Sequence, residues 1–128
     1  MRFFENEREL MRWVLVEARK RGWLACAFGA PFHVVRKAGG TVTIPNKDAI
    51  GFPDLALVHP EHGLVFVELK LDPKTRLRPE QAIWLAALAA AGQRVYVLRA
   101  HQQDAILDVL DGREPSERLS PSFPRAAA

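Results

Sequence analysis

Two apolar runs separated by a short turn lie at the centre of this 128-residue chain and constrain its fold more than any other feature. Residues 55–58 and 64–69 are almost entirely apolar, and the segment between them contains proline and glycine, a pattern that predicts a β-hairpin. Opposed side chains in a hairpin lie about 5 Å apart, which brings Asp54 close to Glu68. Because side chains alternate along a strand, Glu68 and Lys70 share one face. The hairpin therefore gathers two carboxylates and an amine at one end.

The composition indicates a single globular domain with its own core. No apolar run approaches the roughly 18 residues of a membrane span, and the acidic residues near the start of the chain precede no signal-peptide core. The single cysteine, Cys26, cannot form an internal disulfide and favours a reducing compartment, so we expect a cytoplasmic protein. A net charge of +3 is mild support for a polyanionic partner.

Helical and strand periodicity, with glycine and proline at the boundaries, predicts the remaining elements. We expect one domain over residues 1–111, with a basic hairpin insertion at about 30–50. The residues from 112 to 128 are rich in proline, serine and charge, and we expect a tail that is poorly ordered or serves as a docking arm. The expected helices are residues 4–21, 79–91 and 101–111, the further strands are 23–28 and 94–98, and the second hairpin pairs 33–36 with 41–44.

Two polar residues occupy the apolar faces of expected helices. Glu7 falls on the stripe that continues through Leu10 and Met11, so its carboxylate is directed to the core side of the first helix. Its ordinary interpretation is a first-turn acid favoured by the helix dipole. Gln81 stands at the head of the face that continues through Trp84. A glutamine in a first turn is usually solvated, but this direction makes it a candidate site residue.

Basic residues gather in two segments that flank the central hairpin. Their ordinary interpretation is a solvated surface, and their functional interpretation is contact with DNA, because lysine and arginine neutralise phosphates. Glycines at the tip of the insertion allow close backbone approach. The candidate DNA-binding residues are Arg36, Lys37, Thr41 and Lys47 in the insertion, and Lys74, Arg76 and Arg78 in the linker after residue 70.

The acids at the end of the hairpin are suited to a divalent metal. Asp54 and Glu68 offer hard oxygen ligands for Mg²⁺, with Mn²⁺ as a substitute, and the backbone carbonyl of Leu69 and the Glu7 carboxylate could complete the set. Such an ion lowers the pKa of a bound water. Lys70 could orient that water and stabilise charge on the phosphorus. Taken alone, Glu68-Leu69-Lys70 is more typical of a surface ion pair. The order Pro-Asp, turn, Glu-x-Lys and then a helix with glutamine favours the metal site instead.

The central part of the sequence resembles a known family. Pro53-Asp54 followed by Glu68-Leu69-Lys70 is similar to the PD-(D/E)xK nuclease signature, and the surrounding residues from Gly51 to Leu98 resemble its small VRR-NUC branch. The resemblance implies an α/β fold, a central mixed β-sheet flanked by helices in the αβββαβ core of restriction endonucleases. It also implies metal-dependent hydrolysis of DNA phosphodiesters that leaves a 5′-phosphate.

The opening residues Glu7-Arg8-Glu9-Leu10 resemble those of archaeal-type Holliday-junction resolvases. That likeness implies Glu7 as a metal ligand and a homodimer acting on branched DNA, because a symmetric dimer suits a two-fold substrate. Trp13 and Val16, on the outer face of the first helix, are the expected subunit contact. Resolvases of this type carry a serine in the loop before the aspartate and have a shorter insertion, whereas this chain has threonines there, including Thr41.

The leading hypothesis is therefore a Mg²⁺-dependent, structure-selective DNA endonuclease of a phage or prokaryote, most sharply a Holliday-junction resolvase. An alternative within enzymes is a nicking or flap nuclease of repair or phage replication. An alternative from another class is a non-catalytic DNA-binding module on a nuclease fold. A zinc site at His59, Glu61 and His62 is disfavoured because these residues occupy a hairpin turn and have no cysteine partner.

Overall fold

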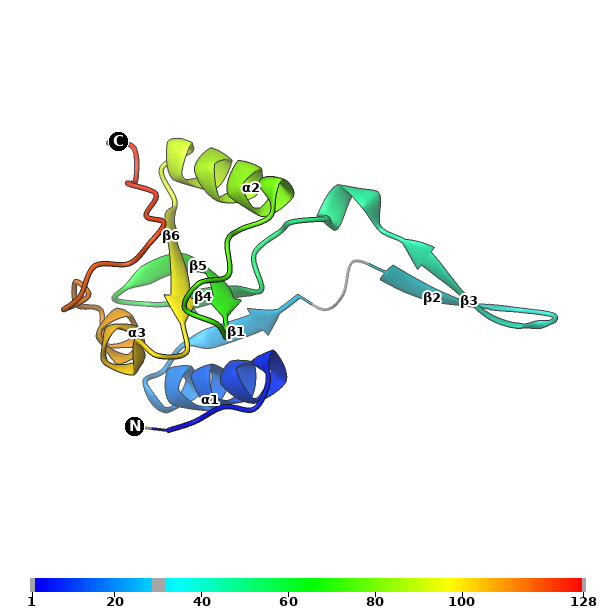
Figure 1. Ribbon diagram of the computed structural model, residues 1–128. Helices are drawn as coiled ribbons and strands as arrows, with labels where there is room; N and C mark the ends of the chain where they lie inside the picture. Colours follow the sequence, from blue (N-terminus) through cyan, green and yellow to red (C-terminus); the bar gives the residue numbers. More distant parts are fainter. Residues whose placement is uncertain (1, 29–31, 128) are drawn as a thin grey trace.

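The computed structural model describes residues 2–28 and 32–127, and Figure 1 shows a sheet with helices on both faces and a separate hairpin. In this part of the chain, no helix has the length and apolar character needed to cross a membrane. The elements are α1 (Glu7–Lys20), β1 (Leu24–Ala27), β2 (Phe32–Lys37), β3 (Gly40–Pro45), the 3₁₀ turn η1 (Lys47–Ala49), β4 (Leu55–His59), β5 (Gly63–Lys70), α2 (Pro79–Ala90), β6 (Arg94–Arg99) and α3 (Gln103–Leu110).

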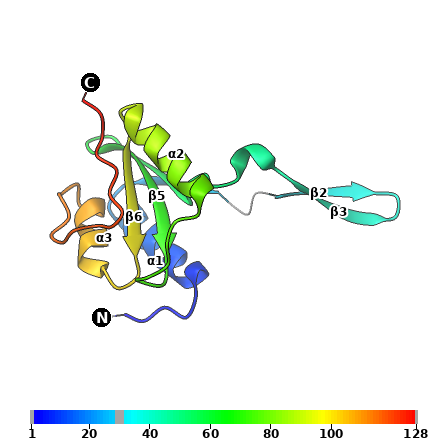
Figure 2. The ribbon, with the colours of Figure 1, turned by 45° about the horizontal axis from the view of Figure 1, so that its top comes forward.

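The main sheet has the strand order β1-β4-β5-β6 and is mixed. β4 runs antiparallel to both β1 and β5, whereas β6 pairs with β5 in parallel through the connection that contains α2. Helices α1 and α3 cover one face and α2 covers the other (Figures 1 and 2). This architecture confirms the predicted α/β fold with a central mixed sheet.

The first helix begins three residues later than expected because Asn6 caps it. Asn6 has extended backbone dihedrals, and its side chain accepts a hydrogen bond of 2.9 Å from the Glu9 backbone N–H. Glu7 and Glu9 then lie in the first turn, where the helix dipole favours acids. The buried stripe of Leu10, Val14 and Ala18 packs the helix onto the sheet and so fixes where Glu7 lies.

Alternation along β5 divides its side chains between the two faces of the sheet. Val65, Val67 and Leu69 pack in the core with α1 and α3, whereas Phe66 packs in the cluster beneath α2. Glu68 and Lys70 follow Phe66 with the same parity and therefore point to the α2 face. The strand thus carries an apolar face and a face that ends in two charges.

The predicted second hairpin is confirmed as a two-stranded sheet of β2 and β3, which projects from the body away from α3 (Figures 1 and 2). Lys37 pairs with Gly40, so the tip consists of Ala38 and Gly39, and Arg36 and Lys37 beside it are exposed. Residues 30 and 31 of the expected insertion lie outside the described residues, as do residues 1 and 128 of the expected domain and tail. The Phe28 backbone N–H donates to the Asp54 carbonyl over 2.9 Å and so joins the two ends of this excursion.

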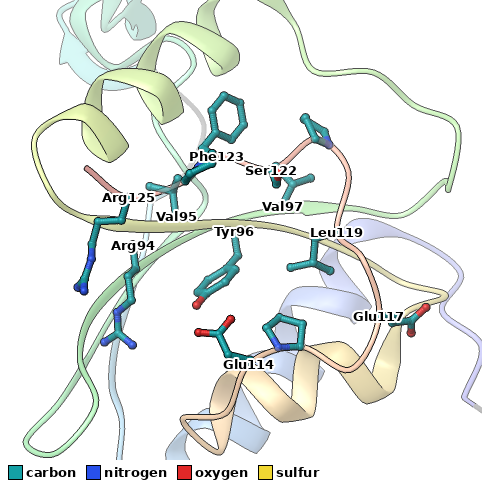
Figure 3. Close-up of a pocket in the computed structure, with 13 residues that line it drawn as sticks. Arg94, Val95, Tyr96, Val97, Glu114, Glu117, Leu119, Ser122, Phe123 and Arg125 are labelled. Carbon is teal, nitrogen blue, oxygen red and sulfur yellow. The ribbon is translucent and has the colours of Figure 1, made fainter. Parts of the chain in front are cut away.

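Residues 113–127, which the sequence predicts to be a poorly ordered tail or a docking arm, pack along the body. Leu119 is buried in the core, and Phe123 packs in the cluster beneath α2. The buried Arg99 and Gln102 side chains donate to backbone carbonyls of this segment, because buried donors need acceptors. Figure 3 shows the segment crossing β6 beside a cavity of about 410 Å³, where the Tyr96 hydroxyl is directed toward Glu114.

The outer face of α1 also differs from expectation. Trp13 is not a free surface residue, because Phe4 folds back onto it with the ring centroids 5.5 Å apart. The indole also packs against the core cluster. Val16 is 45% exposed but stands next to charged side chains such as Lys20. The indole of Trp13 is therefore partly covered within the chain, and its role in a subunit contact stays a prediction.

Candidate active site

Glu68, Lys70 and Gln81 form a buried polar cluster between β5 and α2, in which Gln81 makes hydrogen bonds to the other two. Gln81 Nε2 donates to Glu68 Oε2 over 3.0 Å, and Lys70 Nζ donates to Gln81 Oε1 over 3.0 Å. Lys70 Nζ lies farther, 3.9 Å, from Glu68 Oε2. The three residues are only 3%, 7% and 5% exposed, so their charges interact in a medium much less polar than water.

The start of α2 explains why Gln81 faces the sheet. Pro79 is the first helical residue, where its missing N–H has no cost. The Gln81 side-chain oxygen also accepts from the Arg78 backbone N–H over 2.9 Å, which caps the helix. The same oxygen therefore holds the helix end and the Lys70 amine, and Gln81 is restrained from both sides.

Asp54 completes the cluster from the adjacent strand. Leu55 pairs with Val67, so Asp54 stands opposite Glu68, as the hairpin register predicted. Its Oδ2 accepts from the Leu69 backbone N–H over 2.8 Å, which fixes the carboxylate at the end of the strand pair. The structure thus brings Asp54, Glu68, Lys70 and Gln81 together.

Burial raises the pKa of both acids, and the charge of Asp54 adds to the rise for Glu68. Burial, and then the charge of Asp54, raise the pKa of Glu68 to about 8, although the Lys70 ammonium opposes the change. Burial also raises the pKa of Asp54, although the hydrogen bond from Leu69 opposes it. The two acids are a coupled pair that resists double ionisation without a cation.

A cleft of about 660 Å³ opens beside this cluster, between the first turns of α1 and the loop that precedes β4. Asp54 and Gln81 line it from the sheet side, and Glu7 lines it from α1. The Glu7 carboxylate is exposed, and its charge adds to the rise in the Glu68 pKa. Glu7 therefore shares the electrostatic environment of the buried acids.

The cleft also contains functional candidates that the sequence reasoning missed. Arg8 and Arg12, which are one helical turn apart on α1, line the cleft. Phe28 and Phe52 line it as well. The spacing of Arg8 and Arg12 was a usable signal, because residues four apart lie on the same side of a helix. No comparable local signal exists for Phe28, whose position depends on the pairing of β1 with β4.

The sequence-predicted DNA-binding residues do not form one patch with the acids. Arg78 alone among them lines the cleft. Lys74 and Arg76 are exposed on the loop between β5 and α2. The remaining four lie on the projecting hairpin or at its base, and all are exposed: Arg36, Lys37, Thr41 and Lys47.

The donor set fits a hard divalent cation. Glu68 Oε1 is buried and accepts no hydrogen bond in the described part of the chain, which leaves an oxygen free to bind a cation. Residues 2–28 and 32–127 contain no cluster of three or more His, Cys, Asp or Glu side chains arranged around a metal position. Two carboxylates are nevertheless the usual protein contribution to a magnesium site, which keeps waters and phosphate oxygens as its other ligands.

The histidines of the β4–β5 turn have structural partners. His59 Nδ1 accepts from the Glu61 and His62 backbone N–H groups, and its Nε2 lies 2.9 Å from the Arg21 carbonyl oxygen. The His62 ring stacks on that of His59 with the centroids 4.3 Å apart. Both His59 nitrogens are therefore engaged within the fold, in agreement with the sequence argument against zinc.

Comparison with known proteins identifies the same region. The family model of the VRR-NUC domain matches residues 46–102, which include Asp54, Glu68, Lys70 and Gln81 and exclude Glu7. No curated protein and no solved structure matches the chain. Residues 46–102 of this protein thus match the VRR-NUC domain, a nuclease domain family of the PD-(D/E)xK type.

Proposed function

We propose that the protein is a Mg²⁺-dependent, structure-selective DNA endonuclease, with four-way junctions as its principal substrate. The observation that carries the proposal is the convergence of Asp54, Glu68, Lys70 and Gln81 beside a basic cleft, with one Glu68 oxygen lacking a hydrogen bond. A purely structural ion pair would be expected to satisfy its buried oxygens. This arrangement leaves one available to a cation.

Asp54 and Glu68 would hold the metal, with the Leu69 carbonyl and Glu7 as further ligands. When bound, the ion would neutralise phosphate charge and lower the pKa of a water molecule. Binding requires Glu68 to lose its proton, so its raised pKa makes metal affinity depend on pH.

The remaining residues bind and orient the phosphate. Gln81 holds the Lys70 amine at a fixed distance from Glu68, so that the amine can orient the attacking water and stabilise charge on phosphorus. Arg78, Arg8 and Arg12 line the cleft and would bind the phosphates that flank the cleaved bond. The exposed basic residues of the hairpin and of the β5–α2 loop would contact more distant phosphates.

The test is cleavage of branched and linear DNA by the purified protein with Mg²⁺, Mn²⁺ or a chelator. Asp54→Asn and Lys70→Ala should abolish cleavage and leave DNA binding in place. Lys20→Ala, on the exposed far end of α1, serves as the matched lysine control and should cut normally. Absence of cleavage with either metal on every DNA would instead support a non-catalytic DNA-binding module.

Paired, symmetric nicks on a four-way junction would identify the resolvase form of the activity. A single cut on flaps, with none on junctions, would identify the alternative, a nicking or flap nuclease. We also propose a homodimer for the two-fold junction, which sedimentation of the free protein tests directly. A cytoplasmic location is proposed because the only cysteine, Cys26, is an exposed thiol.

A further inference from the structure

One wall of the cleft is apolar and aromatic, and it lies directly beside the acids. Phe28 follows β1, and its backbone N–H donates to the carbonyl of Asp54 over 2.9 Å. Its ring meets the edge of Phe52 with the centroids 4.8 Å apart. Met11 and Leu15 of α1 add further apolar surface to the cleft.

Phe52 also lines the cleft and is packed against further aromatic rings. Its ring packs at right angles to Trp84 and to Phe66, with centroid distances of 4.9 and 6.0 Å. Phe28 differs because it is 40% exposed while lining the cleft. A fixed aromatic ring therefore supports a second ring whose surface is open to a ligand.

The groups around this wall match the parts of a nucleotide. Arg8, Arg12 and Arg78 line the same cleft and suit phosphate oxygens, and Asp54 marks the proposed position of the metal. Aromatic side chains stack on nucleobases without strong sequence preference. The volume of about 660 Å³ is that of a small-ligand pocket, which a nucleotide fits and a double helix does not.

A base becomes available to such a wall only when it leaves the helical stack. In continuous duplex both faces of each base are covered by its neighbours, and removing a base from the stack costs a few kcal/mol unless it is already unpaired.

We propose that Phe28, supported by Phe52, binds the base of one unpaired nucleotide next to the cleaved phosphate. The inference rests on the proposed nuclease function and deepens it, since it makes an unpaired base at that position a requirement for efficient cleavage. Phe28 is a specificity-determining residue and takes no part in the hydrolytic step.

The test uses 2-aminopurine as a stacking probe in two oligonucleotides of the same local sequence. One places the probe unpaired at a branch, and the other places it within continuous duplex. Binding is measured in a Lys70→Ala background, so that the DNA is not cut. We expect quenching of the unpaired probe only, and Phe28→Ala should remove the quenching and weaken binding of the branched DNA by about 5- to 100-fold.

Two controls separate stacking from folding. Phe28→Tyr keeps an aromatic face and should retain the quenching. Phe3→Ala removes another exposed ring, 89% exposed, which does not line the cleft, and it should change nothing. Thermal unfolding of each variant checks that the fold is intact.

The outcomes distinguish this inference from the proposed function. Equal cleavage of duplex and branched DNA by the wild type, with no effect of Phe28→Ala, would overturn the inference and leave the nuclease intact. Absence of any cleavage would overturn the nuclease, and the binding measurement would still decide whether Phe28 stacks on a base. Quenching that persists in Phe28→Ala would also overturn the inference that Phe28 stacks on the base.

Discussion

Gln81 Nε2 lies 3.0 Å from Glu68 Oε2, and this contact sets the spacing of the whole buried cluster. The same side chain accepts from Lys70 Nζ, which is left 3.9 Å from Glu68 Oε2. Gln81 therefore bridges a carboxylate and an amine whose own ion pair is long. The contacts of Glu68 with Gln81 and Lys70 both involve Oε2, and in the described part of the chain they leave Glu68 Oε1 without a hydrogen bond.

We expect Gln81→Ala to lower kcat about 10- to 100-fold with little change in KM, because Lys70 loses the group that positions it. The change also removes buried hydrogen bonds to charged groups, each worth about 1.5–3 kcal/mol, so the free energy of unfolding should fall by about 2–4 kcal/mol. Steady-state cleavage and urea unfolding measure the two effects. Gln103→Ala, at the start of α3, is the matched control. A wild-type kcat in Gln81→Ala would refute the positioning role.

The raised pKa of Glu68 predicts an unusual dependence of stability on pH in metal-free protein. The folded state holds the proton up to a pKa of about 8, whereas the unfolded chain releases it near the ordinary value of 4.5. The free energy of unfolding is therefore highest below the pKa of the unfolded chain. It decreases as pH rises toward the pKa of the folded state, by up to about 1.4 kcal/mol per pH unit. The raised pKa of Asp54 acts in the same direction.

Thermal unfolding in a chelator should show the melting temperature falling as pH rises from about 5 to 8. Glu68→Gln should remove most of this slope, because the amide does not titrate. Mg²⁺ should restore stability at the upper end of the range, since it binds the ionised acids. A melting temperature that rises with pH through this window would contradict the assignment.

Gly51 should tolerate no side chain. Its φ is +85°, and an added Cβ would lie 2.5 Å from the backbone carbon of Glu80 at the start of α2. Gly51→Ala should therefore lower the free energy of unfolding by at least about 2 kcal/mol, as left-handed backbone alone costs about 1–2 kcal/mol. It should also reduce cleavage, because the loop leads to Asp54. Gly39→Ala at the hairpin tip, which meets nothing within 4 Å, is the control and should unfold at the wild-type urea concentration.

The projecting hairpin should contribute phosphate contacts that appear in the salt dependence of binding. Replacing Arg36 and Lys37 by alanine should weaken DNA binding and reduce the slope of log K against log salt by about 1.8, since each phosphate contact contributes about 0.9. Fluorescence anisotropy over a range of salt concentrations measures the slope. Arg19→Ala with Lys20→Ala, at the end of α1, is the matched charge control. An unchanged slope would mean that the hairpin does not reach the DNA.

Local periodicity was sufficient to predict the centre of the molecule. Strand alternation placed Glu68 and Lys70 together, the turn placed Asp54 opposite Glu68, and helical spacing directed Gln81 toward them. These relationships depend on residues close in sequence, or on one tight turn, so they can be derived from the chain itself.

Contacts between distant segments could not be predicted in the same way. The C-terminal residues have the composition of a disordered tail, but Leu119 is buried in the core, and the Arg99 side chain donates a hydrogen bond to the carbonyl oxygen of Ser120. Phe4 packs on Trp13 from outside the helix, a contact that the periodicity of the helix does not predict. Phe28 lies at the cleft because β1 pairs with β4, and the residues next to Phe28 in sequence do not predict that pairing.

The hydrogen bond between the Phe28 N–H and the Asp54 carbonyl has a consequence for how such a protein can diversify. The chain leaves the sheet after Phe28 and returns at Asp54, so the arm between them begins and ends at this hydrogen bond. Lengthening a loop with fixed ends costs little, about 0.6 kcal/mol for each doubling. Arms of other lengths and charges can therefore be grafted at this point, which would change the reach of the protein along its substrate while the hydrolytic centre stays the same.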